Sequence, residues 1–68
     1  MNLPLKFKIL EKYPSQADFA VAVDANESLV SRIIRGRRRL DPQKQINWAK
    51  RLGCKPKDIF EDEIQNSR

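Results

Sequence analysis

The residues best suited to chemistry in this sequence are arginines that surround a single glycine. They are Arg35, Arg37, Arg38 and Arg39, on either side of Gly36. A guanidinium presents forked N–H donors that match the oxygens of a phosphate. Four such groups close together repel one another unless solvent or a polyanion screens them. The cluster therefore indicates either phosphate binding or an ordinary solvated run of surface charge.

Positive charge is concentrated in the part of the chain that contains these arginines. The 68 residues have a net charge of +5, but residues 1–34 are neutral overall. Residues 35–57 contain nine Lys and Arg against one Asp, a net charge of +8, whereas residues 58–68 have a net charge of −3. A concentration of cations in one segment is typical of proteins that bind a polyanion.

The composition argues against catalytic and metal sites. The chain has no His and one Cys, Cys54. A zinc site needs three or four Cys or His ligands, and a triad needs His. A single thiol forms no disulfide within the chain. We therefore expect no metal, no cofactor and no enzyme activity, and interpret Cys54 as a small buried or half-buried filler.

The sequence contains no membrane-spanning stretch. Nothing approaches the ~18 unbroken apolar residues that a membrane span requires. Lys6, Lys8, Glu11 and Lys12 interrupt the apolar stretch that a signal peptide would need. We therefore expect a soluble cytoplasmic protein with no membrane partner.

Helix signals divide the chain into about five short helices with no strand. Gly36 and Gly53 fall where helices end, and Ser15, Asn26 and Asp41 are good caps where helices begin. The expected segments are Pro4–Lys12, a helix after Ser15, Glu27–Arg35, Pro42–Leu52, and a last short helix or turn over Lys55–Phe60. Residues 1–60 are expected to form one compact domain, and residues 61–68 a polar, acidic, frayed tail.

Apolar positions on these helices predict the core. In the first helix, Leu3, Phe7 and Leu10 form an apolar stripe that Leu5 and Ile9 widen. The other expected core positions are Phe19, Ala20, Val23, Leu29 or Val30, Ile33, Trp48, Ala49, Leu52, Ile59 and Phe60. Ile34 is a further candidate for the inward side of its helix.

Two short helices joined by a short turn, as over residues 16–40, are the layout of a helix-turn-helix. Ala20 is small, which lets the second helix cross closely, and Asp24 occupies a turn position that glycine adopts most easily. These residues resemble the lambda-repressor/Cro-like helix-turn-helix family, also called XRE. The resemblance rests on the runs Gln16–Ala20, Asp24–Asn26, Leu29–Ile33, Arg35–Arg39, Trp48–Gly53 and Ile59–Phe60, and covers about residues 5–60.

Three positions depart from the family pattern. Asp24 replaces the usual turn glycine, which costs some strain. Ile34 replaces a commonly polar or acidic residue, so we expect its side chain to be partly exposed or to contact a partner. Ile9 stands where many members have Arg, so a buried charge pair is absent.

The resemblance implies a sequence-specific DNA-binding transcriptional regulator, a repressor, whose helix 27–35 reads the major groove. It assigns base reading to Glu27, Ser28 and Arg32. Arg32 would contact guanine, and Glu27 would accept from cytosine or repel wrong sites. It assigns backbone contacts to Ser15, Gln16, Asn26, Ser31, Arg35, Arg37, Arg38 and Arg39.

Each of these roles has a structural alternative. Ser15 and Asn26 are also helix caps, and Gln16 is also an ordinary exposed residue of a first helical turn. Arg32 is also able to form a surface salt bridge with Glu27. Ser31 is as well suited to close helix packing as to contact with DNA.

The implied partner is double-stranded DNA with a two-fold operator, bound by a weak or DNA-induced homodimer. Such a dimer would use apolar side chains of the fourth helix, the fifth helix or the tail. Two other functions stay open: the DNA-binding antitoxin of a toxin–antitoxin pair, and a basic RNA-binding module. Few aromatic residues are left over from the core for RNA stacking.

Overall fold

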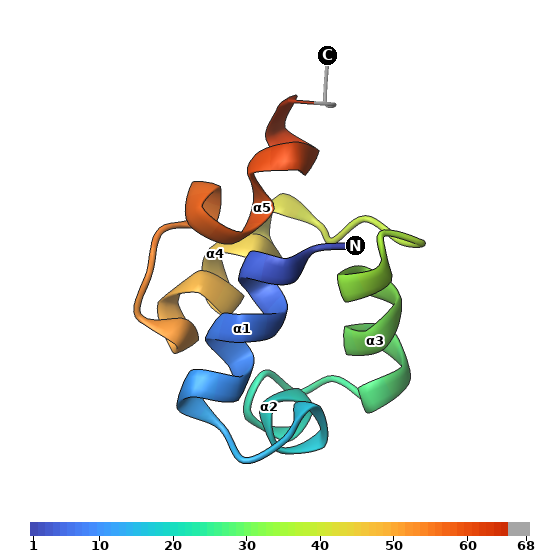
Figure 1. The fold of residues 1–68 in the computed structure, drawn as a ribbon, viewed down its shortest axis with the longest axis vertical. Coiled ribbons are helices and arrows are strands. Elements are labelled where there is room, and N and C mark those ends of the chain that lie inside the picture. Colours follow the sequence, from blue (N-terminus) through green and yellow to red (C-terminus); the bar gives the residue numbers. More distant parts are fainter. Residues whose placement is uncertain (66–68) are drawn as a thin grey trace.

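The computed structural model describes the backbone of residues 1–65 and the side chains of residues 1–60. This part of the chain is all-α and contains five helices and no strand (Figure 1). The helices are α1 (Leu3–Lys12), α2 (Gln16–Ala22), α3 (Glu27–Arg35), α4 (Pro42–Leu52) and α5 (Pro56–Gln65). The all-α fold of short helices predicted from the sequence is confirmed. Among the described residues, no helix has both the length and the hydropathy that a membrane span requires.

The first four helices each begin at a side chain that caps them. The oxygens of Asn2, Ser15, Asn26 and Asp41 accept a hydrogen bond from a backbone N–H two or three residues further on. Such a bond satisfies one of the backbone donors that a helix start leaves without a partner. The caps predicted at Ser15, Asn26 and Asp41 are confirmed.

Left-handed residues end two of the helices and form one turn. Gly36 ends α3 at φ 78° and Gly53 ends α4 at φ 72°. Asp24, in the turn between α2 and α3, has φ 58°, the one positive φ among the described non-glycine residues. Asp tolerates this conformation better than most residues, so the turn forms without glycine.

The core lies where α1 meets the other helices. An edge-to-face contact of Phe19 and Trp48, with ring centroids 5.1 Å apart, joins α2 to α4, and Phe60 lies 6.3 Å beyond Trp48. The core residues are Leu5, Ile9, Phe19, Ala20, Val30, Ile33, Ile34, Leu40, Trp48, Ala49, Leu52, Ile59 and Phe60. Tyr13, Val23, Leu29 and Cys54 are half-buried against them.

The inward face of α1 differs from the sequence prediction. Leu5 and Ile9 are fully buried, whereas Leu3, Phe7 and Leu10 are 45%, 59% and 48% exposed. The prediction that Leu3, Phe7 and Leu10 form the main inward stripe was wrong. Both faces of this helix are apolar, so periodicity alone could not choose between them.

For Ile34, the inward position that the helix pattern allowed is confirmed, whereas the expectation of partial exposure or partner contact was wrong. Its side chain is 3% exposed and belongs to the core. Ile34 lies four residues after Val30 and next to Ile33, so it widens the inward stripe of α3. Its backbone carbonyl accepts a hydrogen bond from the N–H of Asn2, which joins the end of α3 to the start of α1.

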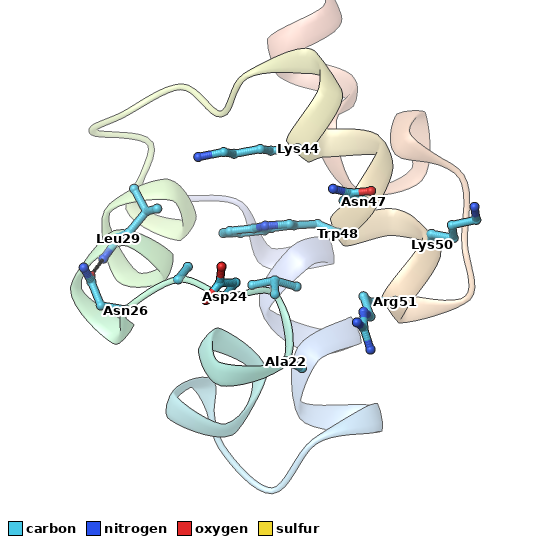
Figure 2. A pocket seen from close by; sticks show the side chains of 11 residues that line it. Ala22, Asp24, Asn26, Leu29, Lys44, Asn47, Trp48, Lys50 and Arg51 are labelled. Atoms are coloured by element: carbon cyan, nitrogen blue, oxygen red, sulfur yellow. Dashed lines mark hydrogen bonds between the residues drawn. The ribbon is translucent and has the colours of Figure 1, made fainter.

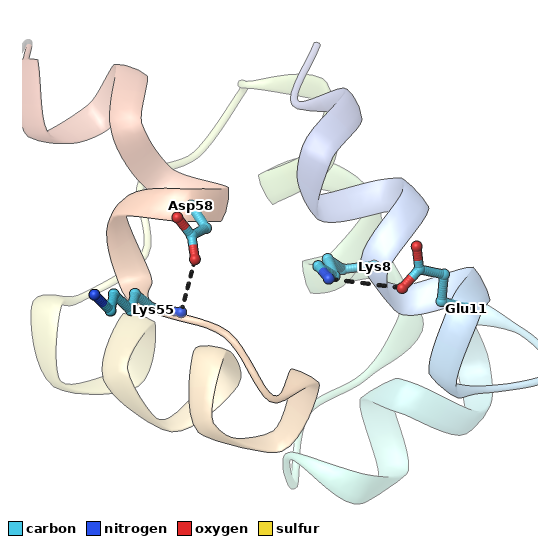
Figure 3. A network of polar contacts seen from close by, with 4 residues as sticks. All are labelled: Lys8, Glu11, Lys55 and Asp58. Carbon is cyan, nitrogen blue, oxygen red and sulfur yellow. Dashed lines mark hydrogen bonds and ion pairs between the residues drawn. The ribbon is translucent and has the colours of Figure 1, made fainter.

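The fifth helix is longer than the short helix or turn expected. The carboxylate of Asp58 accepts a hydrogen bond of 3.1 Å from the backbone N–H of Lys55 at its start (Figure 3). Phe60 has a non-helical φ of −127° and marks a kink. The frayed tail was predicted for residues 61–68. The side chains of these residues, and the backbone of residues 66–68, lie outside the part of the chain that the structure describes.

Candidate nucleic-acid interface

The two sides of α3 have opposite chemistry. Val30, Ile33 and Ile34 are buried on the inner side. Glu27, Ser28, Arg32 and Arg35 are exposed on the outer side, and Ser31 is half-buried beside them. The buried side fixes α3 to the core, so the orientation of the outer side is set by packing and not by the polar residues themselves.

The outer side of α3 and the start of α2 line one open hollow of about 470 Å³. Gln16, the first residue of α2, lies beside the α3 residues there and is half-buried. The lining residues are Gln16, Glu27, Ser28, Ser31, Arg32 and Arg35. All six were proposed from the sequence as base or backbone contacts, and the structure gathers them on one surface.

The arginines after α3 sit on a short, firmly anchored loop. The N–H of Arg37 donates to the carbonyl of Arg32 at 3.0 Å, and Gly36 turns the chain away from α3. Leu40 is 5% exposed and fixes the other end of the loop to the core. Arg37, Arg38 and Arg39 are therefore exposed on a loop that is held at both ends. They do not line the hollow of Gln16 and Arg32.

The capping alternative is confirmed for two of the predicted contact residues. Ser15 Oγ accepts from the N–H of Asp18 at 3.2 Å and donates to its carboxylate at 2.9 Å. Asn26 Oδ1 accepts from the N–H of Leu29 at 2.8 Å. These bonds use the acceptor oxygen of Asn26 and both the acceptor oxygen and the O–H donor of Ser15, and neither side chain lines the hollow.

Arg32 has no ionic partner within the described part of the chain. No ion pair joins Arg32 to Glu27 or to any other described residue. The salt-bridge alternative for Arg32 is therefore not realised. Its forked donors are exposed on the outer side of α3.

A second hollow, of about 760 Å³, lies between the α2–α3 turn and α4 (Figure 2). Lys44, Lys50 and Arg51 line it from α4, and Leu29 of α3 and Asn26, the cap of α3, line it on the opposite side. Trp48 also lines this hollow, but it is only 2% exposed and belongs to the core, as predicted. These cations belong to the segment of net charge +8, residues 35–57. The sequence did not predict that they line a common hollow, because tertiary packing decides what lies beside each face of α4.

The described residues offer no metal site. No group of three or more His, Cys, Asp or Glu side chains comes together among them. Cys54 is half-buried, and burial raises the pKa of its thiol, an effect that the nearby Lys8 opposes and Asp58 reinforces.

Comparison with known proteins finds no matching family model, no similar curated protein and no similar solved structure. The geometry and electrostatics of these surfaces are therefore the basis for inferring a function.

Proposed function

We propose that the chain is a sequence-specific double-stranded DNA-binding protein that represses transcription, with α2 and α3 as its helix-turn-helix. One observation carries the proposal: Gln16 and the outer side of α3 line the same open hollow. A helix that enters the major groove needs such a side, polar, exposed and flanked by phosphate donors.

In this mechanism α3 lies in the major groove, which is about 12 Å wide and admits a helix. Arg32 donates to O6 and N7 of a guanine, the commonest specific contact of arginine. Glu27 accepts from cytosine N4 or rejects sites that lack it, and Ser28 contacts a base edge. These three side chains carry the sequence preference.

Phosphate contacts flank the reading face. Gln16 and Arg35 stand at its edges, and Arg37, Arg38 and Arg39 extend the cationic surface along the following loop. Asn26 and Ser31 add donors from the start and the edge of α3, and Ser15 adds one when its hydroxyl exchanges the Asp18 carboxylate for a phosphate. Contacts of this kind position a protein on DNA and release counterions, without reading sequence directly.

The distribution of aromatic side chains favours duplex DNA over single-stranded RNA. Sequence-specific RNA modules stack unpaired bases on exposed aromatic rings. Here Phe19, Trp48 and Phe60 are buried, and Tyr13 is half-buried. Phe7 is exposed, but it lies on α1 and lines neither hollow. An antitoxin would bind DNA through the same interface. The identity of the neighbouring gene, a toxin or not, distinguishes an antitoxin from a repressor.

Selection of bound sequences from random duplexes, followed by a salt titration, tests the proposal. We expect enrichment of a two-fold site and a log–log slope of the binding constant against salt of about −5 to −6, if about six phosphates are contacted. Arg38→Ala should reduce the slope by about one. No enrichment, a flat salt response, or preference for structured RNA over the duplex would overturn the assignment.

A further inference from the structure

The outer side of α1 is an apolar stripe with no covering within the described residues. Leu3, Phe7 and Leu10 are each about half exposed, at 45%, 59% and 48%. They follow one another at four and three residues, so they lie along one side of the helix. Single exposed apolar side chains scattered over a surface are normal, but several that lie side by side indicate an interaction surface.

The core holds α1 in this orientation. Leu5 and Ile9, on the opposite side, are fully buried and pack within the core. Asn2 also ties the start of the helix down: its backbone N–H donates to Ile34, and its side chain bonds to the carbonyl of Ile59. The helix cannot rotate to bury Leu3, Phe7 and Leu10 without exposing Leu5 and Ile9.

The stripe has the spacing of a coiled-coil seam. With Phe7 at position a, Leu3 and Leu10 occupy the two neighbouring d positions. Lys6 then stands at position g and Glu11 at position e, one on each flank of the seam. Flanking positions of opposite charge are the pattern by which parallel helices pair with each other.

We propose that α1 is a self-association surface, on which the α1 helices of two copies of this chain pair in parallel. Phe7 then packs against Phe7 of the second copy, and Leu3 and Leu10 each meet their own counterparts. Lys6 of each copy lies opposite Glu11 of the other, five residues further on. This proposal concerns surfaces other than the proposed DNA interface and does not depend on DNA binding.

Charge decides between the two possible directions of pairing. In a parallel pair, the Lys6 flank of one helix meets the Glu11 flank of the other, twice over. In an antiparallel pair, like flanks meet, so Lys6 faces Lys6 and Glu11 faces Glu11. Glu11 at present contacts Lys8 at 3.6 Å (Figure 3). Both side chains are exposed, so little stability is lost when Glu11 leaves Lys8 and pairs with Lys6 of the second copy.

The size of the stripe makes the association weak. Three half-exposed side chains per copy offer a few hundred Å² at most. A stable complex buries about 800 Å² on each partner. We therefore expect a monomer–dimer equilibrium that shifts with concentration.

Sedimentation of the 68-residue chain over a range from micromolar to millimolar concentration tests the proposal. We expect a reversible dimer, which Phe7→Glu weakens at least about tenfold by placing a charge in the seam. Val21→Glu is the matched control, because Val21 is 79% exposed and belongs to α2, not to the stripe on α1. A monomer throughout, or equal effects of the two variants, would overturn the proposal. Circular dichroism checks that both variants keep their helices.

A charge swap tests the pairing without changing the apolar stripe. Lys6→Glu and Glu11→Lys should each weaken the dimer, because each places like charges opposite one another. The double variant should recover the affinity of the original chain. If the double variant is weaker than either single variant, Lys6 and Glu11 do not face each other across a seam.

Disulfide trapping distinguishes the two directions of pairing. In a Cys54→Ser background, Leu10→Cys should form a symmetric disulfide at least about tenfold faster than Val21→Cys, owing to its high effective concentration. A mixture of Leu3→Cys and Leu10→Cys chains should then give few mixed disulfides. If the mixed disulfide dominates, the helices are antiparallel and the proposed arrangement is wrong.

Discussion

α1 and α3 are short helices of similar length that use the core in the same way but present opposite outer sides. α1 buries Leu5 and Ile9, and α3 buries Val30, Ile33 and Ile34. The outer side of α1 is apolar over Leu3, Phe7 and Leu10, whereas the outer side of α3 is polar and cationic. The core therefore fixes the orientation of both helices, and the outer residues determine which partner each one suits.

The largest expected effect separates the two sides of α1. Ile9→Ala should lower the free energy of unfolding by about 2–5 kcal/mol, because it leaves a cavity at a fully buried position. Leu10→Ala, its neighbour on the outer side, should change it by less than about 0.5 kcal/mol. Urea unfolding followed by circular dichroism measures both at a concentration where the chain is monomeric. Equal losses would show that Leu10 is packed in solution.

The next effect tests the outer side of α3. Arg32→Ala should remove preference at one base pair of the selected site, at a cost of about 1–3 kcal/mol. Arg38→Ala, on the following loop, should weaken binding to all duplexes alike, because phosphates are the same at every site. Binding to the selected duplex and to single-base variants measures the difference. Unchanged preference in Arg32→Ala would show that another residue reads the sequence.

A smaller effect concerns the left-handed residue that ends α3. Gly36→Ala should lower the stability by about 1–2 kcal/mol, the cost of placing an L residue at φ 78°. Beyond Gly36 and its two neighbours in the chain, no atom lies within 4 Å of the added Cβ, so the backbone conformation accounts for the loss. In a domain of this size the melting temperature should fall by about 4–8 °C for each kcal/mol. Arg38→Ala, on the same loop, is the control and should melt close to the original chain.

The smallest effect is the titration of Cys54. Burial raises the pKa of its thiol, so the folded chain should hold this proton to higher pH than the unfolded chain does. The corresponding stabilisation is complete below the unfolded pKa and is lost as the pH rises through the folded pKa. Alkylation rates against pH, in native buffer and in urea, should show the higher midpoint in the folded state. A lower folded midpoint would contradict the assigned role of burial.

The sequence determined where α2, α3 and α4 begin and where α3 and α4 end, but not the length of α5. Ser15, Asn26 and Asp41 cap helices, and Gly36 ends one, through contacts that span only a few residues. Such contacts form between residues close in sequence, and α3 and α4 begin and end at the predicted residues. The concentration of cations in residues 35–57 is likewise a property of the sequence alone.

The tertiary structure decided which faces are inside and which residues meet. A helix with two apolar sides, such as α1, does not specify from its own periodicity whether Ile9 or Phe7 is buried. The burial of Ile34 and the meeting of Gln16 with the outer side of α3 depend on how the helices pack. Packing is set by the shapes and volumes of all the core side chains together, which no local window of sequence contains.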